Sequence, residues 1–215
     1  MNDIARTYAR TTGALYLVTH VTSVGAVAAY SAGALTLGVA LEFLLALGCL
    51  GTGILLWLLL RASGPARAAT FVALRGLEAA VILAGALPMV ARTLAPLSAE
   101  ATSALTAVHT ASFLVGQGLV IGVNTIVLGS LLLSSGAVPR ALALLGTVGG
   151  ALVLTSDLAQ LSGLIPLNGT IAGICALPIF AFEIWLAVYL IVRGIRPQSH
   201  AALALAADGA FGPRS

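Results

Sequence analysis

The segment VALRGLEAAVIL places Arg75 and Glu78 three residues apart within an apolar run. Residues at i and i+3 share a helix face, so the guanidinium group and the carboxylate can form a direct ion pair. Two uses of such a pair stay open. It can clamp helices in register, or Arg75 can anchor a polar or anionic group while Glu78 acts as its acid or base.

Other polar side chains interrupt the apolar runs, namely His20, Glu42, His109, Gln117, Asn124, Asp157, Gln160 and Glu183. An ionisable group at the centre of a bilayer costs about 2.5 to 3.5 kcal/mol, so such groups normally face the bundle interior and pair. Counting helical rises from the ends of the apolar runs predicts two groups at different depths. The inner group is Arg75, Glu78, His20, Asn124 and Glu183, and the outer group is Glu42, His109, Asp157 and Gln160.

Proton transfer is the chemistry that these residue types favour. A carboxyl group in an apolar cavity can stay protonated at neutral pH and serve as a general acid, and a histidine can serve as a base. The residues expected to transfer protons are Glu78, Glu42, Glu183 and His109. Those expected to bind the substrate are Arg75, Asn124, His20, Tyr16, Asp157 and Gln160.

Metal binding is a weaker expectation, although a histidine with two carboxylates can hold a metal or pass protons. The sequence contains no HxxxH, HExxH or paired-cysteine spacing. His20 and His109 are expected at different depths, which disfavours haem. We therefore predict no metal site and no cofactor. Cys49 and Cys175 are also expected at different depths and are interpreted as packing residues.

A polar stripe runs along the first apolar segment. Thr12, Tyr16, Thr19, Ser23 and Tyr30 return to nearly one direction at 100° per residue, so one side of this helix is polar. Hydroxyl groups of Ser and Thr often bond back to their own helix. We expect about half of the stripe to be inert and the rest to line a cavity.

The elements that must position these residues are membrane-spanning helices. The chain has 215 residues, of which 60% are hydrophobic and only 8% are charged, a balance far from that of a soluble domain. Apolar runs long enough to cross a hydrocarbon core of about 30 Å recur along it. We predict an all-α integral membrane bundle of six transmembrane helices, over residues 12–32, 37–60, 68–91, 105–133, 141–161 and 170–192.

The arginines indicate the orientation. All ten basic residues are arginine, and the absence of lysine excludes Schiff-base chemistry. Eight of them, Arg6, Arg10, Arg61, Arg67, Arg140, Arg193, Arg196 and Arg214, fall on one side of a six-span chain. By the positive-inside rule, both termini are predicted to be cytoplasmic. Because the arginines form no patch, no nucleic-acid partner is expected. Residues 1–197 are predicted to form one transmembrane domain, followed by a short, loosely ordered cytoplasmic tail over 198–215.

Six phrases of the sequence carry a resemblance: RTTGALYLVT, LEFLLALGCLGTG, FVALRGLEAAVILAG, VHTASFLVGQGLV with GVNTIVLGSLL, VPRALALLGTVGG and FEIWLAVYLIVRGIRP. Together they resemble the bacterial multi-pass membrane family known as domain of unknown function 4386, over about residues 9–197. The resemblance implies a compact six-helix protein of the bacterial cell membrane without an established activity. Its charged or polar pattern is matched at Arg10, Glu42, Arg75, Glu78, His109, Asn124, Arg140 and Glu183. Asp157 does not match the pattern.

Three functions stay open. The first is an intramembrane enzyme that acts on a small lipid-soluble, isoprenoid-like substrate by carboxylate and histidine acid–base chemistry. The second is a small-molecule or proton-coupled transporter that uses the same buried acids as a relay. The third is a non-catalytic partner protein whose polar network specifies helix packing. Membrane lipids and a small lipid-soluble ligand are the expected partners, and the sequence does not predict the oligomeric state.

Overall fold

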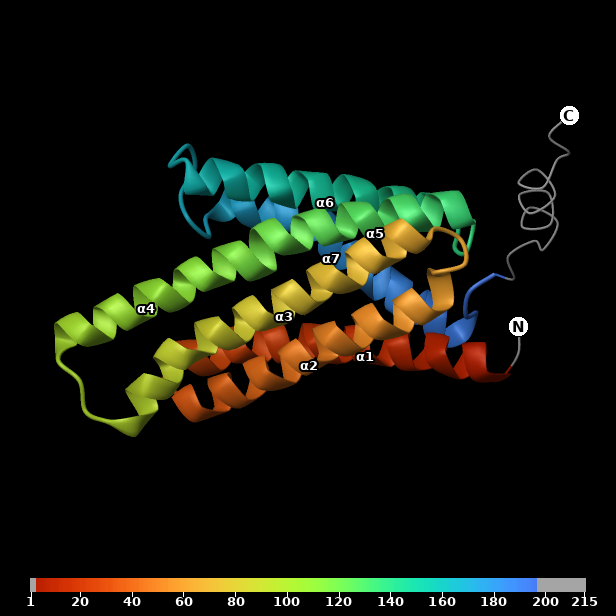
Figure 1. The fold of residues 1–215 in the computed structure, drawn as a ribbon. Helices are drawn as coiled ribbons and strands as arrows, with labels where there is room; N and C mark the ends of the chain where they lie inside the picture. The colour runs from red at the N-terminus through yellow and green to blue at the C-terminus, as the bar shows by residue number, and fades with distance from the viewer. Residues whose placement is uncertain (1–2, 197–215) are drawn as a thin grey trace, which may run out of the picture.

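The computed structural model describes residues 3–196, and all the regular secondary structure in this range is helical (Figure 1). Its elements are α1 (Asp3–Ser31), α2 (Leu35–Leu60), α3 (Pro65–Leu94), α4 (Ala99–Leu114), the π-helix η1 (Val115–Val120), α5 (Ile121–Ser135), α6 (Arg140–Leu161) and α7 (Thr170–Val192). Six helices are long and apolar enough to cross a membrane, with α4, η1 and α5 joined into one of 37 residues. The predicted six-helix bundle is confirmed. The predicted tail over 198–215 lies outside the described residues.

The helices form a closed bundle in which each packs on its neighbours in the chain. Short turns connect successive helices, and α1 also packs against α7, so the first and last helices close the ring. A further contact between α3 and α5 ties its two sides together. In Figure 1, α3 and α4 project beyond the ends of α6 and α7.

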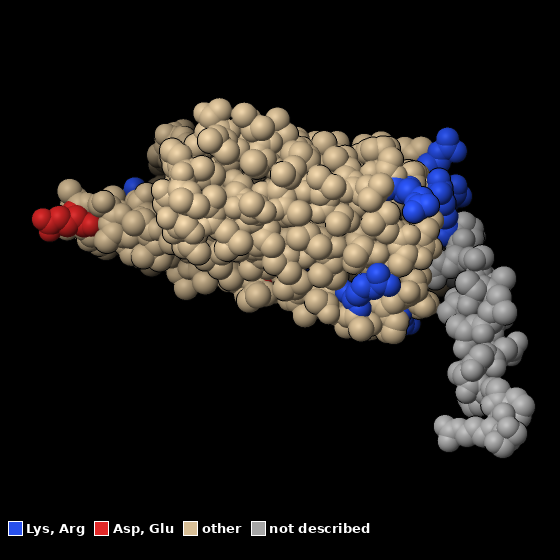
Figure 2. Space-filling model, turned by 90° about the horizontal axis from the view of Figure 1, so that it is seen from above, with Lys and Arg blue, Asp and Glu red and all other residues tan. Residues whose placement is uncertain are grey.

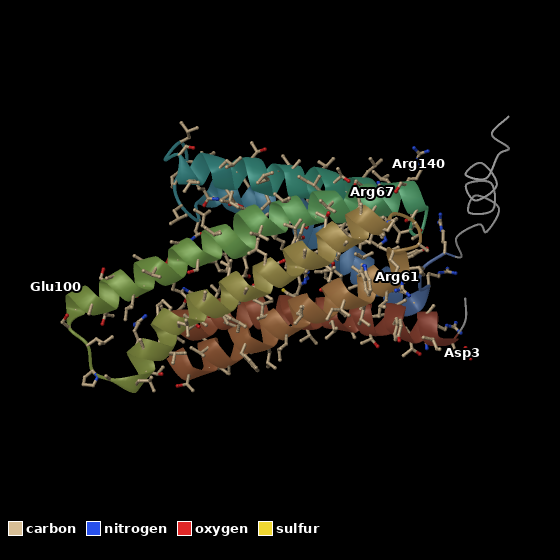
Figure 3. The ribbon with its side chains drawn as sticks, viewed as in Figure 1. Asp3, Arg61, Arg67, Glu100 and Arg140 are labelled. Atoms are coloured by element: carbon tan, nitrogen blue, oxygen red, sulfur yellow. The ribbon has the colours of Figure 1, made fainter. Side chains whose placement is uncertain are left out.

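Charge distinguishes the two ends of the bundle. Arg61, Arg67 and Arg140 lie at the same end as Asp3, near the N-terminus, whereas Glu100 lies at the opposite end (Figure 3). Arginine side chains gather at the first end in the space-filling view (Figure 2). We call this the arginine end and the other the far end. The predicted cytoplasmic location of the arginine end stays a prediction.

Packing is densest toward the arginine end. The main apolar cluster includes Leu60, Phe71, Leu132, Leu142 and Leu186, each at most 1% exposed. By contrast, α4 contains no buried residue over its whole length. A tight crossing of α5 and α6 extends the packed region, because a Cβ added at Gly150 would lie 2.8 Å from the carbonyl oxygen of Gly122. The far half is consequently the more open half of the bundle.

Candidate functional site

A cavity of about 300 Å³ lies inside the bundle, between the packed core and the far end. Its wall combines α1, α2, α3, α7 and the helix that runs from α4 to α5. The lining is mainly apolar, with side chains such as Val24, Leu45, Phe113 and Ile179. The polar residues that line it are Thr19, His20, Ser23, Cys49, Arg75, Glu78, Gln117 and Glu183. An apolar cavity with a few converging polar groups is the usual form of a small-molecule site.

Arg75 and Glu78 form a buried ion pair on α3, with their side chains each 2% exposed. The Arg75 Nη1 donates to Glu78 Oε2 at 2.8 Å. Its Nε and Nη2 both donate to the hydroxyl oxygen of Thr52 on α2, at 3.2 and 2.9 Å. The guanidinium carbon also lies 5.4 Å from the centre of the Tyr16 ring, within range of a cation–π contact. The predicted pair is therefore present on α3, and residues of α1 and α2 contact its guanidinium group.

Glu78 accepts hydrogen bonds from two helices other than its own, α2 and α5. Asn124 on α5 donates its Nδ2 to Oε2 at 2.6 Å. The Cys49 thiol on α2 donates to Oε1 at 3.6 Å. Both oxygens of this carboxylate consequently have protein partners, an arrangement that joins α2, α3 and α5.

His20 and Glu183 face each other across the cavity wall, from α1 and α7. His20 Nε2 lies 3.5 Å from Glu183 Oε2, and the two side chains are 12% and 11% exposed. The other ring nitrogen, Nδ1, lies 2.9 Å from the carbonyl oxygen of Tyr16. Because a carbonyl only accepts, we assign a proton to Nδ1. A hydrogen bond between Nε2 and Oε2 then requires one proton, which either partner can carry.

The expected outer group divides into two clusters. Glu42 on α2 accepts from His109 Nε2 at 2.8 Å and from the Tyr30 hydroxyl at 2.7 Å. Asp157 and Gln160 pair with each other on α6, where Gln160 Nε2 donates to Asp157 Oδ1. Depth alone predicted one group, but α2 and α6 lie on different sides of the bundle, so equal depth does not bring their side chains together.

Gln117 lies where the cavities meet. It sits in the π-helix η1 and accepts a hydrogen bond from the Ser23 hydroxyl at 2.9 Å. It lines the main cavity, a second cavity beside Asp157 and a gap of about 10 Å³ beside His109. A π-turn changes which side chains face the interior and is frequent at functional sites. The sequence analysis noted Gln117 as buried but gave it no role.

The residues that the sequence analysis left out of the site are Cys49, Thr52, Ser23, Tyr30 and Gln117. Cys49 and Thr52 lie one turn apart on α2, on the face that also holds Glu42 and Leu45, so helical periodicity was an available signal. The stripe on α1 behaves as expected in part. Thr12 and Thr19 bond to carbonyl groups of their own helix, whereas Ser23 and Tyr30 reach other helices.

Over residues 3–196, no group of three or more His, Cys, Asp and Glu side chains has a geometry that could hold a metal ion. Cys49 and Cys175 are both free thiols. The polar side chains of the main cavity can form hydrogen bonds, pair charges and transfer protons.

Comparison with known proteins gives one match. No curated protein and no solved structure matches the chain significantly. A family model described as "Domain of unknown function (DUF4386)" matches residues 11–194, a range that includes most of α1, all of the later helices and every polar cluster described above. The chain belongs to this family of membrane proteins of unknown function.

Proposed function

We propose that this multi-pass membrane protein is an intramembrane enzyme that transfers a proton to or from a small lipid-soluble substrate in the main cavity. The observation that carries the proposal is the contact of His20 Nε2 with Glu183 Oε2, at 3.5 Å, in the wall of a cavity of about 300 Å³. That volume lies at the lower end of the range for small-molecule sites, about 300 to 1,000 Å³. We further propose that the protein resides in the bacterial cell membrane with both termini in the cytoplasm.

In this proposal the two pairs beside the cavity have different roles. The contact between His20 and Glu183 is longer than an ordinary hydrogen bond, so a substrate group can come between the two side chains. One partner then donates a proton to one position of the substrate while the other removes a proton from a second position, so the substrate is isomerised and the pair keeps the same number of protons. After the product leaves, the two side chains can exchange the proton directly and restore the starting state. Glu78 is already bonded by Arg75, Asn124 and Cys49. We therefore assign it to holding Arg75 in place rather than to proton transfer.

Arg75 is the proposed anchor for a polar group of the substrate. Three of its five N–H groups donate to Glu78 and Thr52, and the guanidinium group lines the cavity. The remaining N–H groups can donate to an oxygen of the substrate. The gap beside Glu42 and His109 has a volume of about 10 Å³, which leaves room for about one water molecule and is too small for a substrate. These two residues are therefore proposed to support the site from a distance.

The test uses a variant that keeps the shape of the cavity but has no acid at position 183 to transfer a proton. Glu183→Gln preserves shape and removes the acid, so it should retain substrate that the unmodified protein converts. Both proteins are purified in mild detergent and their bound molecules are extracted and compared by mass spectrometry. Glu100→Gln, an exposed carboxylate at the far end, is the matched control.

The expected result is that a small apolar molecule, the substrate, is enriched in the Glu183→Gln extract. Cells that carry the unmodified protein should contain its product, which differs from the substrate by the position of a proton. Recovery of the same molecules in equal amounts from all three proteins would refute acid–base turnover at this pair. Loss of the bound molecule from His20→Ala as well would place it in the main cavity.

Proton-coupled transport is the second candidate, and one observation favours it. Polar pairs follow one another from Glu42 and His109 to His20 and Glu183, with Gln117 lining the spaces between them. Such a series of groups can relay protons across a membrane. Solute flux into proteoliposomes that stops when the pH gradient is removed would support transport. Flux that is unchanged in Glu183→Gln would exclude a role for this relay.

A further inference from the structure

A second cavity, of about 280 Å³, lies at the far end between η1, α6 and α7. It shares Phe113, Gln117 and Ala176 with the main cavity. Asp157 is the only ionisable residue in its wall. None of the residues that line it belongs to the His20–Glu183 pair, so an inference about this cavity does not depend on the proposed function.

The Asp157 carboxylate is oriented by a fixed chain of hydrogen bonds. The backbone N–H of Asn168 donates to Gln160 Oε1 at 2.7 Å, and this contact identifies which end of the Gln160 amide is oxygen. The NH₂ group of Gln160 therefore donates to Asp157 Oδ1. Asn168 adopts a left-handed backbone conformation, with φ 53°, which asparagine accepts more readily than most residues other than glycine. The loop before α7 therefore presents this N–H group to Gln160.

Two oxygen atoms of this site have no hydrogen-bond partner among the residues that the structure describes. They are Asp157 Oδ2 and the neighbouring Ser156 Oγ, both buried. The two residues are 8% and 6% exposed and both line the cavity. A buried carboxylate oxygen without a donor is costly, and membrane interiors offer no water to satisfy it. The pair of unpartnered oxygens indicates that a hydrogen-bond donor from a ligand belongs here.

The charges around Asp157 indicate which class of hydrogen-bond donor a ligand would carry. Asp157 lies near the C-terminal end of α6, where the helix dipole adds negative potential. Arg61, Arg67 and Arg140 are at the opposite end of the bundle. A cation is therefore favoured over a neutral donor. A bare inorganic ion would fill little of the cavity, since even a water molecule takes up about 30 Å³.

We infer that the second cavity binds an organic ammonium group, whose N–H groups donate to Asp157 Oδ2 and Ser156 Oγ while its apolar substituent fills the space toward Phe113. The ligand class is a small amphipathic amine. Gly118 of η1 is a positioning residue for this site, because a Cβ added there would lie 2.6 Å from Asp157 Oδ2 and displace the carboxylate.

Binding is tested with the full chain in nanodiscs of a neutral lipid, using benzylammonium chloride as the probe. Benzyl alcohol is its uncharged counterpart, and sodium chloride tests an inorganic cation. Thermal unfolding and calorimetric titration report binding. We expect benzylammonium to bind and to raise the unfolding temperature, while equal concentrations of benzyl alcohol and sodium chloride leave it unchanged.

Variants distinguish binding of the probe at this site from its nonspecific partition into lipid. Asp157→Asn and Gly118→Ala should each weaken benzylammonium binding about tenfold or more, since each removes a charged hydrogen bond. Gly76→Ala is the matched control, because Gly76 does not line this cavity and an added Cβ there meets no atom within 4 Å. It should bind the probe as the unmodified protein does.

Three results would overturn the inference: equal binding of the amine and the alcohol, stabilisation by sodium alone, or equal affinity in Asp157→Asn and Gly76→Ala. If Asp157→Asn and Gly118→Ala do not fold, Ser156→Ala decides. A rise of several fold in its dissociation constant for benzylammonium supports the site, and an unchanged constant refutes it.

Discussion

The Arg75–Glu78 pair offers the sharpest test of the physical reasoning, through Glu78→Leu, Arg75→Met and the double variant. Glu78→Leu leaves a buried guanidinium group without its counter-charge, since Arg75 is 2% exposed. Removing one partner of a buried pair costs about 3 to 5 kcal/mol, mostly through the charge left alone. Arg75→Met should cost a similar amount by leaving the carboxylate with only Asn124 and Cys49.

The double variant removes both charges, so its cost should be smaller than that of either single variant. The groups that lose a partner are the Thr52 hydroxyl, which still donates to the carbonyl of Cys49, the Nδ2 of Asn124 and the thiol of Cys49. Hydrogen bonds within membrane proteins contribute about 0.6 kcal/mol on average. The four lost bonds therefore amount to about 2 kcal/mol, and the double variant should be more stable than each single variant by about 2 kcal/mol.

The assay is reversible unfolding in mixed micelles, followed by helix content, for all four proteins. A double variant as destabilised as the sum of the two single variants would refute the account, because it would mean that the charges do not compensate each other. If the double variant keeps full stability and also every cellular phenotype, the pair is structural, as the partner-protein hypothesis requires.

Three further predictions rest on the other contacts. Gly150→Ala should destabilise the protein by about 1 to 3 kcal/mol in the same assay, because its Cβ would lie 2.8 Å from the backbone of α5. Gly76→Ala is the control and should be neutral or slightly stabilising, since an added Cβ there meets no atom within 4 Å. Tyr30→Phe should cost about 1 kcal/mol by removing one hydrogen-bond donor to Glu42. His109→Ala should cost about 2 to 3 kcal/mol, because it removes the other donor together with the ring contact on Tyr30, so equal costs would contradict the pairing. In a Cys175→Ser background, an impermeant maleimide applied to intact cells should label Ala95→Cys but not Ser63→Cys, and the reverse pattern would invert the predicted topology.

The six spans could be predicted because each is an apolar run that ends at Gly, Pro or Arg, and the lipid requires every such run to be helical. The helix boundaries agree closely at α6 and α7. The first and fourth spans differ most, since residues 12–32 and 105–133 were predicted and the helices extend over Asp3–Ser31 and Ala99–Ser135. Small and polar residues such as Thr102 and Ser103 lower the hydropathy at the start of the fourth span, but they are compatible with a helix that projects beyond its neighbours.

The contents of the site were less predictable, for a geometric reason. The sequence fixes the face of a helix on which a residue lies, so the pairing of Arg75 with Glu78 at i and i+3 could be inferred. It does not fix which helices are neighbours. The partners of Glu78 on α2 and α5, and the separation of Asp157 from His109, depend on that arrangement. The π-turn at Gln117 also has no clear sequence signal beyond Gly116 and Gly118.

The distances distinguish the polar pairs by what each can do. Arg75–Glu78 and His109–Glu42 both meet at 2.8 Å and have further hydrogen-bond partners, so a ligand would have to break several bonds to reach them. His20 and Glu183 meet at 3.5 Å, beside open volume. Since a proton transferred to a ligand must come from a group that can leave its present partner, the loosest pair is the best candidate for chemistry. The tight pairs keep neighbouring charges balanced, and that balance allows a cavity to persist in the middle of a membrane bundle.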